Sequence, residues 1–583
     1  MIGRPRNPTR RLARSAELAI LAGICLLSIR HWLGELNLSP DSTTYITAAG
    51  NLIRTGRLFY FANAASWSME PEVEPYTEQP PGFVFYLAPF VAAVGEPIDA
   101  ALIAQGVAIV AFYAALYLIL TRLRLVPLLR IATMGIFAFL APFVQVRSFL
   151  WSETLFVAFC LAIGWVAIKL VLDDGRPSDW LLLLGLLAAG SSIRLVGVAN
   201  LFWIAPILLR RRHLLAGIRL LANRFVYSAL ALGGLATTLV FLFADALGIG
   251  TRGGLGPTQI LGIAFGLGAL LLGGGAFVLV RISRVRPWSA AQDAGPGGRD
   301  LWPAAAVAAS ILPVLLWFLR NEVLFGAASL TNRAFEAFHP DHLGAPFSYF
   351  WDETLNVRFL PQAVVALCVL AFLGAPFFVG SRQRRTAHLC LIAAGLGQLA
   401  AVWIPSLASE ISGLGDRLLS PTIALAALAS LHGLQTAADS LAPRRWAAVL
   451  LLLPFAFLAL GRDIVPRELL SYPGRINYPI ERSLWRELHE LDALRSSTHF
   501  YSDRDFVHQV FAGIPQRIVW DTRILRDPAA VDTLLASGEG PFILLREGSW
   551  EAGAVEELMA SGQVPLEKIA FQRYGFVLYY PPE

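Results

Sequence analysis

The composition of this 583-residue chain excludes a soluble globular protein. Hydrophobic residues make up 56% of the chain and charged residues only 15%, whereas a soluble domain carries about 25% charged residues. Several stretches exceed the ~20 apolar residues that cross a bilayer core, namely those within 99–121, 219–245, 257–280 and 417–437. We therefore expect a polytopic α-helical membrane protein whose partners include the lipid bilayer.

The net charge of +5 is unevenly distributed along the chain. Residues 462–583 carry 13 basic and 18 acidic side chains, whereas residues 1–461 carry 34 basic and 24 acidic ones. Basic residues in short loops stay on the cytoplasmic side of a membrane. The clusters expected on that side are 1–15, 122–130, 210–224, 281–286, 382–385 and 444–445. Since these arginines are scattered between apolar runs, they form no nucleic-acid patch, and no nucleic-acid partner is expected.

The alternation of apolar runs and basic breaks predicts about thirteen crossings within residues 1–461. The first crossing is followed by a long outer loop, 34–98, in which the apolar stretch 81–95 is expected to form a short interfacial helix. Two short helices are expected to turn at Arg194. The expected crossings are 15–33, 99–121, 128–146, 153–172, 180–193, 197–209, 219–245, 257–281, 301–320, 361–380, 386–405, 417–437 and 446–461.

An odd number of crossings of the plasma membrane places the acidic tail, 462–583, outside the cytoplasm when the N-terminus is cytoplasmic. Helix-like and strand-like stretches alternate in this tail. The expected strands are 498–502, 516–520 and 542–546, followed by a hairpin within 567–580 that turns at Gly575. Alternation at this spacing predicts a small extracytoplasmic α/β domain with a mainly parallel sheet.

The first outer loop contains a candidate catalytic carboxylate, Asp41. It lies just after the first membrane helix, at the beginning of a second helical pattern. A carboxylate at the membrane rim can act as a general base that deprotonates an acceptor hydroxyl. The alternative is a purely structural N-cap that satisfies exposed amides of the helix.

Two other acidic positions are candidates for substrate binding. Tyr76 and Glu78 directly precede the Pro80-Pro81-Gly82 break, although a proline pair often does no more than begin a helix. Glu153 opens an apolar helix, where it could hold an acceptor, orient a cation or contribute to a metal site. Its structural alternative is stabilisation of the helix N-terminus by the macrodipole.

In this order the motifs resemble the GT-C class of membrane glycosyltransferases, which includes protein O-mannosyltransferases and lipid A aminoarabinose transferases. The resemblance extends over essentially the whole chain. The positions that carry it are Asp41, then Tyr45, Ala49, Leu52 and Gly56, then Pro80 to Phe83, Ser152-Glu153, Ser191 to Arg194, Arg320-Asn321 with Phe325-Gly326, Arg417 to Pro421, and Phe500 and Phe511 in the tail.

The resemblance implies an enzyme that moves a hexosyl or pentosyl group from a polyprenyl-phosphate donor to an extracytoplasmic glycan, lipid or protein acceptor, with inversion. Asp41 is then the catalytic base, and Tyr45, Tyr76, Glu78 and Glu153 contact substrate. The leaving phosphate needs cations, for which the candidates are Arg147, Arg194, Arg320 and Arg417. The alternative for each arginine is that it anchors its helix at the headgroups.

The sequence departs from the aminoarabinose-transferase pattern at Gln79, where those enzymes resemble a Lys-Pro-Pro segment. A phosphate-binding lysine is therefore absent, and that substrate becomes less favoured. A divalent metal is left open, because His339, Asp341 and His342 could chelate one, although a polar loop needs no metal. The sequence 248–253 fits G-x-G-x-x-G but has no preceding strand, so a loop is expected there.

A transporter or flippase of a lipid-linked substrate is the competing functional class. Transporters are often built from inverted repeats and carry ionisable groups near mid-membrane. The sequence shows no inverted repeat and few such groups. A non-catalytic membrane anchor for the tail is a third alternative, but it leaves the polar motifs of several loops without a role.

Overall fold

A computed structural model gives the structure of the chain. It describes residues 8–34, 37–61, 73–77, 79–173, 176–205, 301–325, 346, 372–378, 380–406, 416–440, 478–491, 499–503, 507–508, 511, 518–521, 542–580 and 582. The chain divides into two compact units. Unit 1 comprises 1–113, 137–155 and 462–583, and unit 2 comprises 114–136 and 156–461.

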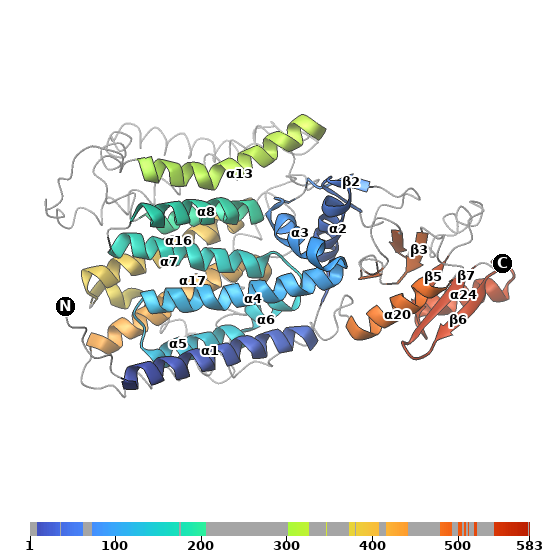
Figure 1. The fold of residues 1–583 in the computed structure, drawn as a ribbon, viewed down its shortest axis with the longest axis horizontal. Helices are drawn as coiled ribbons and strands as arrows, with labels where there is room; N and C mark the ends of the chain where they lie inside the picture. The colour runs from blue at the N-terminus through green and yellow to red at the C-terminus, as the bar shows by residue number, and fades with distance from the viewer. Residues whose placement is uncertain are drawn as a thin grey trace, which may run out of the picture. The chain divides into compact units, whose positions relative to one another are not determined.

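Long apolar helices dominate the described part of residues 1–461 (Figure 1). Their bounds are α1 Pro8–Gly34, α4 Pro97–Arg122, α5 Pro127–Phe139, α6 Ala141–Ser148, α7 Glu153–Leu172, α8 Pro177–Ile193, η1 Leu195–Ile204, α13 Leu301–Phe325, α16 Arg382–Ser406 and α17 Asp416–Ser440. Within unit 2, α8 packs against α13 and η1, and α16 packs against α17 and η1. The chain is a multi-pass membrane protein.

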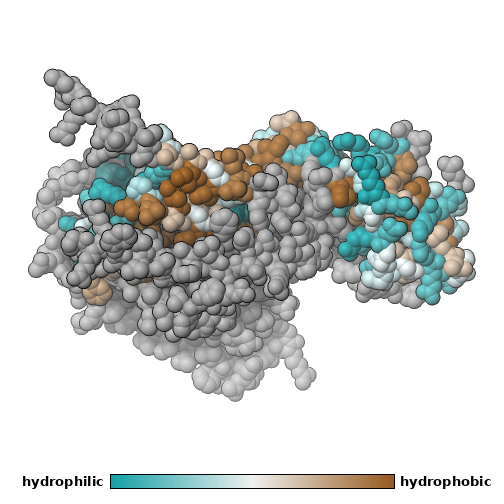
Figure 2. All heavy atoms as spheres, turned by 90° about the horizontal axis from the view of Figure 1, so that it is seen from below, coloured by the Kyte–Doolittle hydropathy of each residue, from teal (hydrophilic) through white to brown (hydrophobic). Residues whose placement is uncertain are grey.

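The described residues contain five helices long and apolar enough to cross a membrane, or six if the bent pair α5 and α6 is one span. The expected number of about thirteen is therefore not reached within the described ranges. The predicted crossings 219–245, 257–281 and 446–461 lie outside them. Figure 2 shows hydrophobic residues over the helices and hydrophilic residues over the tail. Exposed apolar side chains on α13, such as Leu315 and Leu319, are in keeping with contact to lipid.

Three local predictions differ from the structure. The crossing predicted over 128–146 is not one straight helix, because α5 and α6 meet at a bend of 57° just before Pro142, where proline cannot continue the hydrogen-bond ladder. After the expected break at Arg194, the chain forms the 3-10 helix η1 rather than an α-helix. Finally, α13 continues to Phe325, so Arg320 lies inside the helix instead of at its predicted end.

The loop after α1, predicted to lie outside, folds into α2 (Pro40–Thr55), a hairpin of β1 (Phe59–Phe61) and β2 (Val73–Pro75), and α3 (Gly82–Val94). The hairpin was not predicted. Ser39 caps α2 in a capping box with Ser42, and Gly56 ends the helix in the left-handed conformation at φ +70°. The short helix predicted over 81–95 is observed as α3, which packs on α2, and its position at the membrane surface stays a prediction.

The tail contains a five-stranded sheet in the order β4-β3-β5-β7-β6. Strands β3 (His499–Ser502), β4 (Ile518–Asp521) and β5 (Ile543–Arg546) are parallel, and the hairpin β6 (Glu567–Phe571) and β7 (Phe576–Tyr580) joins β5 antiparallel. Helices α20 (Tyr478–Glu490) and α24 (Trp550–Ala560) accompany the sheet. The parallel strands and the hairpin confirm the predicted elements, and Gly575 adopts φ +72° at the turn.

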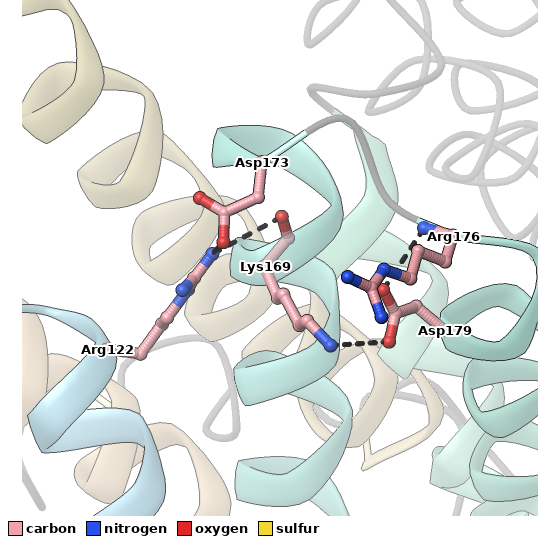
Figure 3. A network of polar contacts seen from close by, with 5 residues as sticks. All are labelled: Arg122, Lys169, Asp173, Arg176 and Asp179. Atoms are coloured by element: carbon pink, nitrogen blue, oxygen red, sulfur yellow. Dashed lines mark hydrogen bonds and ion pairs between the residues drawn. The ribbon is translucent and has the colours of Figure 1, made fainter. Parts of the chain in front are cut away.

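An ion network joins three helix ends in unit 2 (Figure 3). Arg122 at the end of α4 pairs with Asp173, just past the end of α7. Lys169 pairs with Asp179 in the first turn of α8 at 2.6 Å, and the backbone N–H of Arg176 donates to the same carboxylate at 3.1 Å. These contacts hold the three ends together, as the charge pattern predicts for helix ends on one side of a membrane.

Candidate functional site

The candidate base Asp41 lies in the first turn of α2 and is partly exposed. The structural alternative, that Asp41 is the N-cap, is wrong. The side chain of Ser39 accepts the Ser42 backbone N–H, and the Ser42 hydroxyl accepts the Ser39 backbone N–H. Because the serines cap the helix, the Asp41 carboxylate is not needed for capping.

Tyr45 lies one helical turn after Asp41 and therefore on the same face of α2. It is buried, its ring packs edge-on against Phe83 of α3 at 4.8 Å, and its hydroxyl donates to Gln79 Oε1. The hydroxyl also lies 3.3 Å from the Ser152 hydroxyl, which directly precedes α7. Tyr45 thus connects the base-bearing helix to the segment before α7.

The turn before α7 is held against the first loop by further polar contacts. The Asn37 backbone N–H donates to Ser148 O at 2.7 Å, and the Trp151 indole donates to the Ser39 hydroxyl at 2.6 Å. Gln105 of α4 donates to Phe149 O at 3.1 Å. We define the first-loop cluster as Asn37, Ser39, Tyr45, Gln79, Gln105, Trp151, Ser152 and Glu153, all of which lie in unit 1.

Glu153 is the buried acid of this cluster, with only 1% of its surface exposed. It begins α7, and the Ser152 hydroxyl donates to its Oε2 at 3.4 Å. Burial of a carboxylate is costly unless the group is hydrogen-bonded or paired. Its contact with Ser152, which lies beside Tyr45, places the carboxylate in the polar segment before α7.

Arg147 is buried in α6, and oxygens of the protein surround its guanidinium. Nε donates to Phe143 O at 2.9 Å, and the two terminal nitrogens donate to Tyr113 Oη and Ala138 O. The Tyr113 hydroxyl in turn lies 2.7 Å from Ser28 of α1. These contacts favour a structural role that ties α1, α4 and α6 together.

The other three candidate arginines lie in unit 2, and all are partly exposed. Arg194 ends α8 in an extended conformation, where its N–H donates to Gly190 O. Arg320 lies over the Trp317 ring at 4.6 Å and donates to Asn321 Oδ1 at 2.7 Å. Arg417 lies in the first turn of α17.

Two remaining sequence candidates have no supported substrate role. Tyr76 is fully buried, its backbone N–H donates to Leu58 O, and its ring meets Tyr60 edge-on, which is a packing role in the loop. Glu78 lies outside the described residues, as do His339 and the rest of the candidate metal group. Among the residues that the structure describes, no three His, Cys, Asp or Glu side chains gather as a metal site.

Sequence reasoning missed part of the first-loop cluster. Ser39 and Ser42 were overlooked as the cap, although Ser-x-x-Ser before a helical pattern is a recognisable signal. Gln105 was overlooked too, although an amide inside an apolar run is unusual. The contact between Trp151 and Ser39 had no sequence signal, because 112 positions separate the two residues.

Comparisons with known proteins give structural likenesses only. No protein-family model matches the sequence, and no curated protein matches it. Among solved structures, the chain is similar to the archaeal oligosaccharyltransferase AglB from Archaeoglobus fulgidus in complex with an inhibitory peptide and a dolichol-phosphate. That match has a TM-score of 0.46 and 11% identity, over 91% of this chain and 69% of the other.

A second likeness is to ArnT from Cupriavidus metallidurans bound to undecaprenyl phosphate. Its TM-score is 0.35 at 11% identity, and the match covers 97% of each chain. A likeness at 11% identity concerns the fold alone and assigns no function to the side chains of this chain.

Proposed function

We propose that the protein is a GT-C-like glycosyltransferase that moves a sugar from a polyprenyl-phosphate donor to an acceptor on the extracytoplasmic face of the plasma membrane. The N-terminus is then cytoplasmic and the tail, 462–583, extracytoplasmic. The observation that carries the proposal is the position of Asp41. Its carboxylate lies in the first turn of α2, beside two serines that already cap the helix, and on the helix face of Tyr45.

In the proposed reaction, the Asp41 carboxylate removes the proton of an acceptor hydroxyl. The acceptor oxygen attacks the anomeric carbon from the face opposite the phosphate. The bond between that carbon and the phosphate oxygen breaks, and the polyprenyl phosphate leaves with the bonding electrons. One new glycosidic bond replaces one glycosyl phosphate bond, with inversion at the anomeric carbon.

The neighbouring groups have supporting roles in this proposal. Glu153 orients the acceptor together with Ser152 and Tyr45, because its carboxylate can accept a hydrogen bond from an acceptor hydroxyl. The departing phosphate gains negative charge and needs cations, for which Arg194, Arg320 and Arg417 remain the candidates from the sequence. Arg147 is assigned to the fold, since its donors already bind Phe143, Tyr113 and Ala138.

The test uses the full chain purified in detergent with lipid-linked sugars extracted from host membranes. We expect Asp41→Asn to lower the rate of sugar transfer by about 10²–10⁴-fold, because it removes general-base catalysis. Its unfolding temperature should stay near that of the wild type. The matched control is Ser39→Ala, which removes the cap and should cost about 1 kcal/mol of stability, with transfer chemistry retained.

The same assay separates the enzyme from a flippase. Transfer needs no second compartment, whereas transport does, so sugar transfer in detergent supports the enzyme. Movement of the lipid across proteoliposomes without any transfer in detergent would establish the transporter alternative. Full transfer activity in purified Asp41→Asn protein would remove Asp41 from the mechanism.

A further inference from the structure

The order of the parallel strands in the tail reverses at β3. After β3 the chain adds β4 on one side of it, and then β5 on the other. In open α/β sheets, ligands bind outside the carboxyl ends of the strands at the point where the strand order reverses. The place to search for a ligand site in the tail is therefore the carboxyl edge of β3 and β5.

A buried carboxylate lies at this edge. Asp503 directly follows β3, and its side chain is only 1% exposed. Its Oδ2 accepts a hydrogen bond from Arg546 Nε at 2.8 Å, at the end of β5. Its Oδ1 is buried and has no hydrogen-bond partner among the residues that the structure describes. A buried carboxylate oxygen without a donor is unfavourable, and a ligand that donates a hydrogen bond would satisfy it.

Three buried side chains form hydrogen bonds at the end of β3. The Ser502 hydroxyl lies 2.7 Å from His508 Nδ1, and His508 Nε2 lies 3.2 Å from Glu481 Oε2 of α20. All three residues are at most 2% exposed. The three residues have the types of a hydrolytic triad, but their hydrogen bonds join them to one another, and they hold in place the residue that precedes Asp503.

An exposed aromatic residue stands at the same edge. A three-residue turn with Gly548 at φ +76° leads from β5 into α24, whose first residue is Trp550. The Trp550 side chain is 49% exposed. An indole offers a flat apolar surface with a polar tip. A sugar ring has the complementary character, with an apolar face of C–H groups and an edge of hydroxyls.

We propose that the carboxyl edge of β3 and β5 is a carbohydrate-binding site. Asp503 Oδ1 accepts a hydroxyl proton, the terminal nitrogens of Arg546 donate to a neighbouring hydroxyl oxygen, and Trp550 packs on the sugar ring. The Asp503–Arg546 pair carries no net charge, so its arginine disfavours a metal cation and its carboxylate disfavours a phosphate. A neutral polyhydroxyl ligand suits both groups.

If the proposed glycosyl transfer holds, this site would bind the glycan acceptor, and that assignment rests on the proposed function. The site itself can be tested without any transfer reaction. The probes are the methyl glycosides of common hexoses and pentoses, added one at a time to the full chain in detergent. Saturation-transfer NMR titration gives the dissociation constant of each, and inorganic phosphate and Ca²⁺ serve as probes of other ligand classes.

We expect saturable binding of at least one methyl glycoside. Asp503→Asn should weaken it at least about tenfold, since a hydrogen bond to a charged acceptor is lost. Trp550→Ala should weaken it similarly, and because this side chain is exposed, the variant keeps the fold. Glu556→Gln on the same helix α24 is the matched control and should bind as the wild type does.

The site and the proposed function can fail separately. Asp41→Asn protein should bind the glycoside normally, so binding without transfer by the wild type would remove the enzyme and keep the site. Transfer by the wild type without glycoside binding, or binding that both Asp503→Asn and Trp550→Ala leave unchanged, overturns the site. Asp503-dependent binding of phosphate or Ca²⁺ instead of sugars overturns the proposed ligand.

Discussion

The ion network of α4, α7 and α8 and the first-loop cluster differ in the polar contacts that the structure describes for them. In the network, each carboxylate meets a cation, as Asp179 meets Lys169 at 2.6 Å (Figure 3). In the first-loop cluster, the hydrogen bonds join hydroxyl, amide, indole and carbonyl groups, and the carboxylate of Glu153 accepts from the Ser152 hydroxyl.

Under the proposed function, the network stabilises the fold, whereas the first-loop cluster takes part in the reaction. Mutual neutralisation holds helix ends together and leaves little potential for a substrate. In the same proposal Glu153, which accepts a hydrogen bond from the Ser152 hydroxyl, acts on an acceptor hydroxyl, and groups that act in a reaction are often placed at the expense of local stability. The expectation is that substitutions in the network change unfolding, whereas substitutions of Glu153 and Tyr45 in the first-loop cluster change the kinetics of transfer.

The largest expected effect in this comparison belongs to Glu153→Gln. Loss of the carboxylate misplaces the acceptor and should lower kcat about 10²-fold, with little change in unfolding temperature. Steady-state transfer assays and thermal unfolding in detergent measure the two quantities. A variant that unfolds early but turns over normally would show that Glu153 is structural after all.

Lys169→Met should show the reverse pattern. It leaves Asp179, whose side chain is 10% exposed, without its cation, and loss of a partner from a largely buried charge costs about 1–3 kcal/mol. Unfolding by denaturant should reveal this loss while kcat stays at the wild-type level. Lys169→Arg is the matched control and should restore most of the stability, because it keeps the charge.

A smaller effect is expected for Tyr45→Phe. The ring still packs on Phe83, but the hydroxyl contacts to Gln79 and Ser152 are lost, and a hydrogen bond of this type contributes about 0.5–1.5 kcal/mol. We expect KM for the acceptor to rise several-fold with kcat nearly constant. If kcat falls as far as it does in Glu153→Gln, then Tyr45 acts in the chemical step and not only in acceptor binding.

The smallest effect should come from an exposed pair in the tail, Lys568 with Glu556. Hydrogen bonds from Lys568 and Tyr579 hold the pKa of Glu556 below its ordinary value of 4.5. A lowered carboxyl pKa adds stability above that value, and this stability is lost as the pH falls through the folded-state pKa. Glu556→Gln should destabilise by less than about 1 kcal/mol.

A pH series checks this last prediction. Near neutral pH the wild type should unfold slightly later than Glu556→Gln, and the difference should vanish as the pH falls below 4.5. A difference that grows on acidification would mean that the pair is not the source of the shift. The result gives the stability that an exposed ion pair contributes, for comparison with that of the more buried Lys169–Asp179 pair.

The sequence predicted the elements whose signals are local. Apolar runs bounded by arginine predicted α4, α7 and α16, and the alternation of strand-like and helix-like stretches predicted the parallel strands and the hairpin at Gly575. It also placed Asp41 at the beginning of a helix that follows the first apolar segment. Each of these signals lies within about twenty consecutive residues, the range over which hydrophobic period and helix caps act.

Only the tertiary structure decided which polar groups meet. The Tyr45 hydroxyl finds Ser152 across 107 positions, and Asp503 meets Arg546 across 43. Such pairs leave no periodic pattern, because they depend on how separate elements pack and on which strand lies beside which. The sequence thus determined helices, strands and the candidate base, whereas packing decided that Trp151 meets Ser39, that Arg147 contacts Tyr113, and that the tail sheet holds a buried carboxylate at its edge.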